Sequence, residues 1–209
     1  DPQECPPHSS APTAGLTSCI CQGGYESNGA SGADLVCTAC PVDTFSPGGG
    51  AACEPCPVGA RSGEAASSCQ CVPGYEPAAG LCSPCAPGTY SPAGGACLSC
   101  PAGYYCAGHN QTTPAPCPSH STSTGGASAC SCEAGYYHHE NGTCVPCGPN
   151  TFSGLGAQEC EPCPDGSTSG EAASQCVCSA GYAVNVQDGA LQCIRCGPGT
   201  YSEHGGPCV

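Results

Sequence analysis

The apolar residues of this chain follow no helical period. No window of about 11 residues places them at the spacing of an amphipathic helix. Glycine, proline, serine and asparagine interrupt the sequence every few residues, which predicts that turns dominate. We expect short two-stranded hairpins next to the Cys-x-Cys sites and almost no helix. An isolated hairpin is only marginally stable in water, so these hairpins need another source of stability.

An ordinary hydrophobic core cannot supply that stability. Leu, Ile, Val and Phe together number 19 of the 209 residues, and the chain has no Trp and no Met. Burial at ~25 cal/mol/Å² could not offset the ordering entropy with so few large side chains. Cysteine numbers 26, and a disulfide that closes a loop of about 12 residues adds roughly 3 kcal/mol in the chain-entropy model. The predicted fold class is therefore small disulfide-rich modules in a linear array, made mostly of turns and loops with short β-hairpins.

The net negative charge of the chain excludes some classes of binding partner. Arg61 and Arg195 are its only basic side chains apart from histidine, and the formal net charge is −14. Such a chain lacks the basic surface that binds nucleic acid or an anionic membrane. No apolar run approaches the ~20 residues that span a bilayer. We therefore expect no nucleic acid partner and no membrane insertion in this segment.

The cysteines indicate an oxidising compartment. Their even number predicts 13 disulfides without a leftover thiol, which requires an extracellular or cell-surface location reached by the secretory pathway. Two N-glycosylation sequons, at Asn110 and Asn141, agree with that location. The sequence begins at Asp1 without a leader, and we expect that a leader has been removed or that the chain is a piece of a longer array.

Metal binding is the alternative explanation of the cysteines. Seven Cys-x2-Cys pairs have a spacing that also suits tetrahedral zinc. They are Cys37/Cys40, Cys53/Cys56, Cys82/Cys85, Cys97/Cys100, Cys144/Cys147, Cys160/Cys163 and Cys193/Cys196. Zinc modules usually lie in intracellular chains that carry Lys and Arg, and they do not need the Cys-x-Cys spacing that alternates with these pairs. We therefore favour disulfides and predict no metal site.

Four segments repeat one signature, Cys-x-Cys-x2-Gly-Tyr, starting at Cys19, Cys69, Cys130 and Cys176. Six cysteines in each of four units, with two more in an insertion, account for all 26. The predicted organisation is a partial unit over 1–37, units over 40–82, 85–144 and 147–193, and the start of a further unit over 196–209. The insertion lies within the third of these, over 100–116.

Eight of the 11 aromatic residues occupy two positions of this repeat. An aromatic ring beside a disulfide buries a large area in a unit that has little else to bury, so we assign these rings a structural role. The eight are Tyr25, Tyr75, Tyr136 and Tyr182 at the first position, and Phe45, Tyr90, Phe152 and Tyr201 at the second.

The repeat resembles known cysteine-rich modules. Cys-x-Cys-x2-Gly-Tyr followed by a further cysteine is similar to EGF-like modules, and the segments Cys69–Cys82 and Cys130–Cys144 match that signature fully. The Gly-Thr-Tyr-Ser loops followed by Cys-x2-Cys-Pro resemble the cysteine-rich repeats of ephrin-receptor-type ectodomains and tumour-necrosis-factor-receptor modules. The resemblance covers essentially the whole chain, and it implies a module type rather than a function.

The resemblance implies a disulfide pairing but leaves two alternatives. The EGF-like frame joins the first cysteine to the third and the second to the fourth, as in 40–56 and 53–69 or 147–163 and 160–176. The other frame joins successive cysteines, as in 40–53 and 56–69. We favour the EGF-like frame, although sequence alone does not decide connectivity. Four pairs are common to both frames: Cys21–Cys37, Cys71–Cys82, Cys132–Cys144 and Cys178–Cys193.

Other candidate sites carry less weight. The acidic segment Asp1–Cys5 is similar to the lead-in of calcium-binding EGF modules, but the cysteines after it do not match. His138, His139 and Glu140 are metal-ligand types, yet neighbours on a turn rarely converge on one ion, so we interpret them as a polar loop tip. The histidines occupy no repeated position and every cysteine belongs to the repeat, so no catalytic set emerges. We predict no enzyme activity and no cofactor.

These features favour a structural function. In an array of modules each unit contacts mainly its neighbours, which predicts a rod or stalk in an extracellular assembly such as a filament or surface coat. Its expected partners are other chains of that assembly, including copies of itself, and glycans. The Ala/Gly/Pro bias and the absence of Lys resemble large protist or algal surface glycoproteins, including those of flagellar hairs (mastigonemes). The alternative is a receptor ectodomain, which would gather the remaining tyrosines, Tyr104, Tyr105 and Tyr137, on one exposed face.

Overall fold

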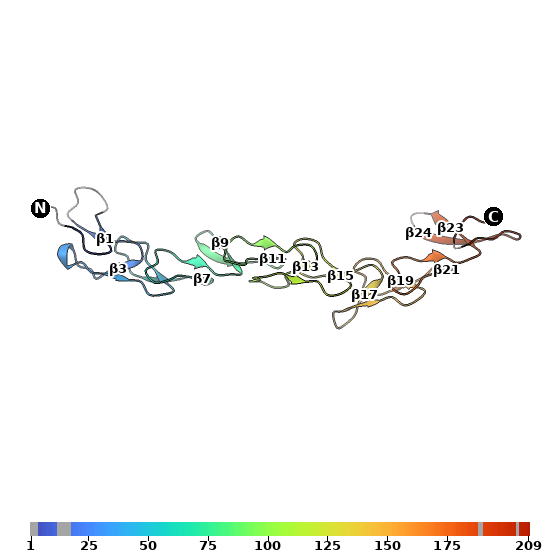
Figure 1. Ribbon diagram of the computed structural model, residues 1–209, viewed down its shortest axis with the longest axis horizontal. Helices are drawn as coiled ribbons and strands as arrows, with labels where there is room; N and C mark the ends of the chain where they lie inside the picture. The colour runs from blue at the N-terminus through green and yellow to red at the C-terminus, as the bar shows by residue number, and fades with distance from the viewer. Residues whose placement is uncertain (1–3, 12–17, 188–189, 204) are drawn as a thin grey trace. The chain divides into compact units, whose positions relative to one another are not determined.

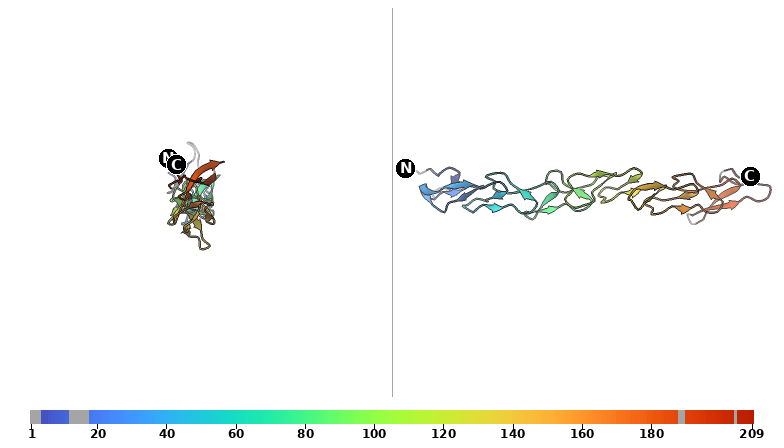
Figure 2. Two further views of the ribbon diagram at one scale, coloured as in Figure 1. Left: turned by 90° about the vertical axis from the view of Figure 1, so that its right-hand side faces the viewer. Right: turned by 90° about the horizontal axis from the view of Figure 1, so that it is seen from below.

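The computed structural model describes residues 4–11, 18–187, 190–203 and 205–209. Within these residues it contains short antiparallel two-stranded sheets and one 3-10 helix, η1 (Gly32–Asp34), and no α-helix. Figures 1 and 2 show the strands as short arrows separated by long stretches of loop. The chain is thus a series of small hairpins, as its sequence predicts.

Every sheet is a hairpin of two strands that follow each other along the chain. In the first half, β1 (Ser9–Ser10) pairs with β2 (Ile20–Cys21), β3 (Tyr25–Ser27) with β4 (Cys37–Ala39), β5 (Thr44–Phe45) with β6 (Glu54–Pro55), β7 (Ala60–Arg61) with β8 (Gln70–Cys71), β9 (Tyr75–Ala78) with β10 (Leu81–Pro84), and β11 (Thr89–Tyr90) with β12 (Leu98–Ser99). In the second half, β13 (Tyr104–Tyr105) pairs with β14 (Ala115–Pro116), β15 (Ser121–Thr122) with β16 (Ser131–Cys132), β17 (Tyr136–His138) with β18 (Cys144–Pro146), β19 (Thr151–Phe152) with β20 (Glu161–Pro162), β21 (Ser167–Thr168) with β22 (Val177–Cys178), and β23 (Tyr182–Gln187) with β24 (Ala190–Arg195).

A turn of one kind recurs thirteen times in the described part of the chain. It begins directly after the cysteine that opens each loop, and its third residue has a positive φ of 59–90°. The fourth residue of the turn donates its N–H to the carbonyl of the first at 3.0–3.2 Å. A positive φ confined to the third residue with this bond is the signature of a type II turn. The third residues are His8, Gly24, Asp43, Gly59, Gly74, Gly88, Gly103, His120, Gly135, Asn150, Gly166, Gly181 and Gly199.

Each loop that starts with such a turn is closed by its own disulfide. All 26 cysteines lie in the described residues, and none of them is free. Twelve bridges join successive cysteines with Cα–Cα distances of 5.5–5.8 Å, and Cys100 and Cys106 are disulfide-bonded as well. The bridges, rather than a core, hold each hairpin closed.

This connectivity corrects the EGF-like frame. The structure pairs Cys40 with Cys53 and Cys56 with Cys69, not Cys40 with Cys56. The same successive pattern joins 147 to 160 and 163 to 176. The physical reason is that each hairpin folds back within one loop, so the cysteine before its first strand meets the cysteine beside its second strand. The four pairs common to both frames are present.

The interior of the modules consists of sulfur and serine. Most buried side chains in the described residues are cystines, and Leu35 is the only aliphatic one among them. Four buried serines follow the second aromatic position of the repeat: Ser46, Ser91, Ser153 and Ser202. Each hydroxyl donates to a backbone carbonyl at 2.7–2.9 Å, which removes the cost of burying it.

Hydrogen bonds between backbones join neighbouring loops. At four equivalent positions the glycine of a turn donates its N–H to the carbonyl of the buried serine in the next loop at 2.8–2.9 Å, as Gly135 does to Ser153. The carbonyl of the same glycine accepts the N–H of the cysteine that opens that loop, as Gly135 does from Cys147 at 2.8 Å. The chain divides into two compact units, 1–99 with 106–114 and 100–105 with 115–209. These bonds lie inside one unit or the other.

Candidate functional site

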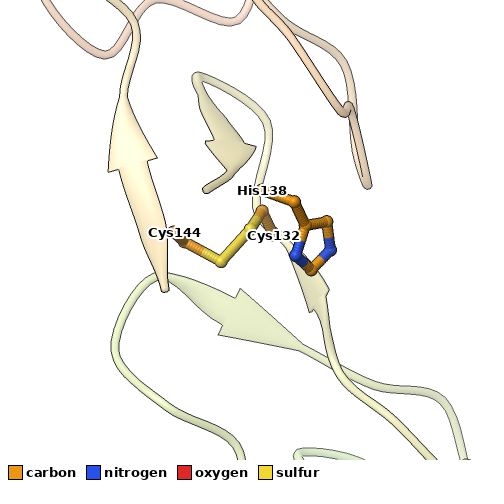
Figure 3. Close-up of side chains that lie close together, drawn as sticks. All are labelled: Cys132, His138 and Cys144. Atoms are coloured by element: carbon orange, nitrogen blue, oxygen red, sulfur yellow. A yellow bond between two sulfur atoms is a disulfide. The ribbon is translucent and has the colours of Figure 1, made fainter. Parts of the chain in front are cut away.

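The donor groups closest to a metal-site geometry lie around the disulfide of one hairpin. His138 on β17 is the cross-strand partner of Cys144 on β18, and Cys144 is bonded to Cys132 on β16. The two sulfur atoms and a ring nitrogen of His138 lie within 4.8 Å of one another. Figure 3 shows the imidazole ring beside the bridge. Because both sulfurs are held in the disulfide, neither is a thiolate ligand in this oxidised state.

The other members of the predicted polar loop tip are not part of this group. His139 and Glu140 are exposed, and the Nδ1 atom of His139 lies 3.2 Å from the Oδ1 atom of Asn141. Within the described residues, the group of possible ligands at the Cys132–Cys144 bridge contains His138 and the two cysteines, and neither His139 nor Glu140 belongs to it. The calcium lead-in Asp1–Cys5 lies outside the described residues over Asp1–Gln3.

Both sequons are exposed at the surface. At Asn141 the side-chain Oδ1 accepts the backbone N–H of Thr143 at 3.1 Å and the hydroxyl of Thr143 at 2.6 Å. This turn is closed by the two residues that an N-glycosylation site requires. At Asn110 the residue adopts a φ of 59°, and its Nδ2 donates to the hydroxyl of Tyr75 at 3.2 Å.

The first set of repeated tyrosines lies against the turn of the preceding loop. His8 stacks on Tyr25 with ring centroids 4.3 Å apart and planes at 10°. His120 stacks on Tyr136 at 4.2 Å and 9°. In the two equivalent places a glycine occupies the turn, and the ring covers its Cα so closely that an added Cβ would overlap it. These are Gly59 under Tyr75 and Gly166 under Tyr182.

The remaining aromatics divide by exposure. Phe45, Tyr90 and Phe152 are half-buried, whereas Tyr201 is 60% exposed. Tyr104 and Tyr105 are consecutive on β13, so their side chains leave opposite faces of the strand. Tyr104 is 41% exposed, and Tyr105 and Tyr137 are half-buried. The three tyrosines therefore do not share one face.

A groove of about 650 Å³ lies within the first unit. Its lining includes Phe45, Pro55, Pro77 and Leu81 beside the Cys71–Cys82 bridge, with Glu54 as its charged group. Leu81 is 60% exposed.

No family model matches the chain, and no curated protein sequence matches it. Among the described residues there is no helix with the length and apolar character that a bilayer crossing requires. The chain thus stands as a cysteine-rich, disulfide-bonded repeat of small hairpins. Disulfides in this number are typical of proteins that mature in an oxidising compartment.

Two features of the modules escaped the sequence reasoning. One is the thirteenfold turn, whose signal is a Gly, His, Asp or Asn three residues after each opening cysteine. The four-unit repeat does not reveal the turn, because each complete unit contains three loops, or four in the unit over 85–144, and every one of them begins with it. The other is the buried serine, which lies next to the aromatic residue to which we assigned the buried role. A serine hydroxyl gives no sequence signal of burial, because serine is usually exposed.

Proposed function

We propose that the chain is a structural segment of a secreted or cell-surface glycoprotein, a disulfide-stapled stalk within a filament or surface coat. The observation that carries the proposal is the continuous series of closed loops. Consecutive bridges are only two or three residues apart within each unit, as at Cys53 and Cys56 or Cys69 and Cys71. Tension along the chain is therefore carried mainly by covalent bridges and short connecting segments, which suits a load-bearing role.

The scarcity of trypsin sites is consistent with the same role. Arg61 and Arg195 are the only trypsin sites, and Arg61 lies inside the loop that the Cys56–Cys69 bridge closes. Cleavage there leaves the two ends joined by sulfur, whereas Arg195 lies between the Cys178–Cys193 and Cys196–Cys208 bridges, where cleavage separates the chain. We also propose that the segment has no catalytic activity and needs no cofactor.

The Gly-Thr-Tyr-Ser loops followed by Cys-x2-Cys-Pro support a proposed relation to the ephrin-receptor-type or tumour-necrosis-factor-receptor-like repeats, and the successive pairing departs from the EGF-like frame. The proposed setting is a large protist or algal surface protein, as in flagellar hairs. The proposed partners are other chains of that assembly, copies of this chain, and the glycans of Asn110 and Asn141.

Immunolabelling tests the proposal. Antibodies raised against the oxidised chain should label an extracellular filament or coat on intact, unpermeabilised cells of the source organism. The labelled structure should withstand detergent and dissociate after a thiol reductant. Label found only inside permeabilised cells would refute the extracellular location, and label on dispersed monomers would refute the assembly.

A ligand-binding ectodomain is the second candidate, and the groove beside Leu81 favours it. A partner seated there would cover Leu81, so L81E should abolish binding to the native cell surface while L98E should not. Leu98 is the control because it is 48% exposed and lies outside the groove lining. Equal behaviour of both variants would leave the structural role as the better account.

A further inference from the structure

We propose that Cys132, Cys144 and His138 form a metal site that opens when their disulfide is reduced. The oxidised bridge consumes both sulfurs, as Figure 3 shows, so the site exists only in the dithiol state. Its ligand is a divalent ion that accepts sulfur and imidazole donors, with Zn²⁺ as the type case. The site is independent of the structural function proposed above.

The register of the hairpin places the histidine. His138 is directly opposite Cys144, and directly opposite residues of an antiparallel pair have Cβ atoms about 4.5–5.5 Å apart. The corresponding bridges of the other three units have a non-ligating residue in this register position. Ser27 faces Cys37, Pro77 faces Cys82, and Val184 faces Cys193. The Cys132–Cys144 bridge is therefore the one of these four that has an imidazole beside it.

The geometry requires little movement after reduction. With Zn–S bonds of about 2.3 Å in a tetrahedral site, the two sulfurs lie about 3.8 Å apart. All three donor atoms already lie within 4.8 Å of one another. The neighbouring bridges Cys117–Cys130 and Cys147–Cys160 hold both ends of this loop in place when its own bridge opens. Cys132 is completely buried, whereas His138 and Cys144 are half-buried, so an ion can reach the site from solvent.

A monothiol of the glutathione class can reduce the Cys132–Cys144 disulfide. Two molecules of the thiol reduce the disulfide to two cysteine thiols and become one disulfide themselves. Binding of the metal ion then releases the two thiol protons, and the neutral imidazole donates its nitrogen lone pair. Three protein ligands leave one coordination position for water or another donor.

The test is a redox titration of the full oxidised chain in glutathione buffers, with and without Zn²⁺. Free thiols are alkylated after a chelator has removed the metal, and they are assigned by mass spectrometry. Zinc binds the reduced pair alone, so a free concentration 100 times its dissociation constant should raise the reduced-to-oxidised ratio of this bridge about 100-fold. The other bridges should not respond to zinc.

Three variants make the result specific. H138Q should abolish the zinc response of the Cys132–Cys144 bridge, whereas H139Q should keep it, because His139 is exposed and lies outside the donor group. V184H places an imidazole opposite Cys193 and should create the response at the Cys178–Cys193 bridge. A zinc response that persists in H138Q, or the absence of any response in the wild-type chain, would overturn the proposal. A silent V184H would also count against it, because the hairpin register would then not be what sets the site.

Discussion

Reduction of the disulfides should lengthen the chain under tension by an amount that the bridge positions fix. Between Cys5 and Cys97 the shortest covalent path runs through six successive bridges, with Cα–Cα distances of 5.5–5.8 Å, and the short peptide segments between them. The path through these bridges contributes about 34 Å, and the thirteen peptide steps between them add about 45 Å at ~3.5 Å per residue. The oxidised segment can therefore extend to roughly 80 Å.

The reduced segment is much longer. Its 92 peptide steps reach roughly 300–330 Å when fully extended, so reduction releases about 230 Å. The segment from Cys117 to Cys208 contains six bridges of the same kind and should release a similar length. The whole chain should thus gain at least about 450 Å, in steps of about 30–50 Å as single bridges open.

Single-molecule force spectroscopy with handles at the two termini measures this gain. The oxidised chain is pulled first, and a reductant is then added at constant force. A double C40A/C53A variant is the matched control, because it should add about 40 Å to the oxidised chain and remove one step from the reduction. An oxidised chain that extends by several hundred ångströms without reductant, or a reduction without added length, would refute a load path through the bridges.

The remaining predictions concern connectivity, packing and modification. Non-reducing digestion at acid pH with a proline-specific endopeptidase should separate the chain after Pro55 and after Pro162, because no bridge crosses either point; a linked product would favour the EGF-like frame. G135A should destabilise its loop more than G181A, because both positions have positive φ but only the Cβ at Gly135 would overlap a backbone carbonyl. The difference of about 1–3 kcal/mol should make hydrogen exchange roughly 5- to 150-fold faster at the amide that donates to the glycine carbonyl, which is Cys147 N–H for Gly135 and Cys196 N–H for Gly181. Equal exchange rates in the two variants would contradict the packing argument. N141Q should remove one glycan mass from the secreted chain, as measured by mass spectrometry before and after glycosidase, and an unchanged mass would show that this sequon is not used.

The histidines show which contacts the cysteine spacing predicts and which contacts depend on the tertiary structure. His8 and His120 have no special position in the four-unit repeat, yet both occupy the positive-φ place of a turn and stack on a tyrosine of the next loop. The spacing to the opening cysteine contains this information, because glycine holds the same place in most other loops. The contact of His138 with a disulfide follows from hairpin register, which no local pattern specifies.

Composition by itself determined what kind of molecule this is. A chain with 26 cysteines and few large aliphatic residues can order itself only through covalent bridges. The disulfide-rich fold class, the hairpins and the scarcity of helix therefore follow from the residue counts and from the frequent glycine and proline. Connectivity was decided by the tertiary structure. Cys40 has similar sequence distances to Cys53 and Cys56, and only the fold of the hairpin brings Cys53 to it. The burial of serines beside aromatics that are only half-buried or exposed was likewise decided by the tertiary structure, because it depends on which backbone carbonyls lie within reach of each serine hydroxyl.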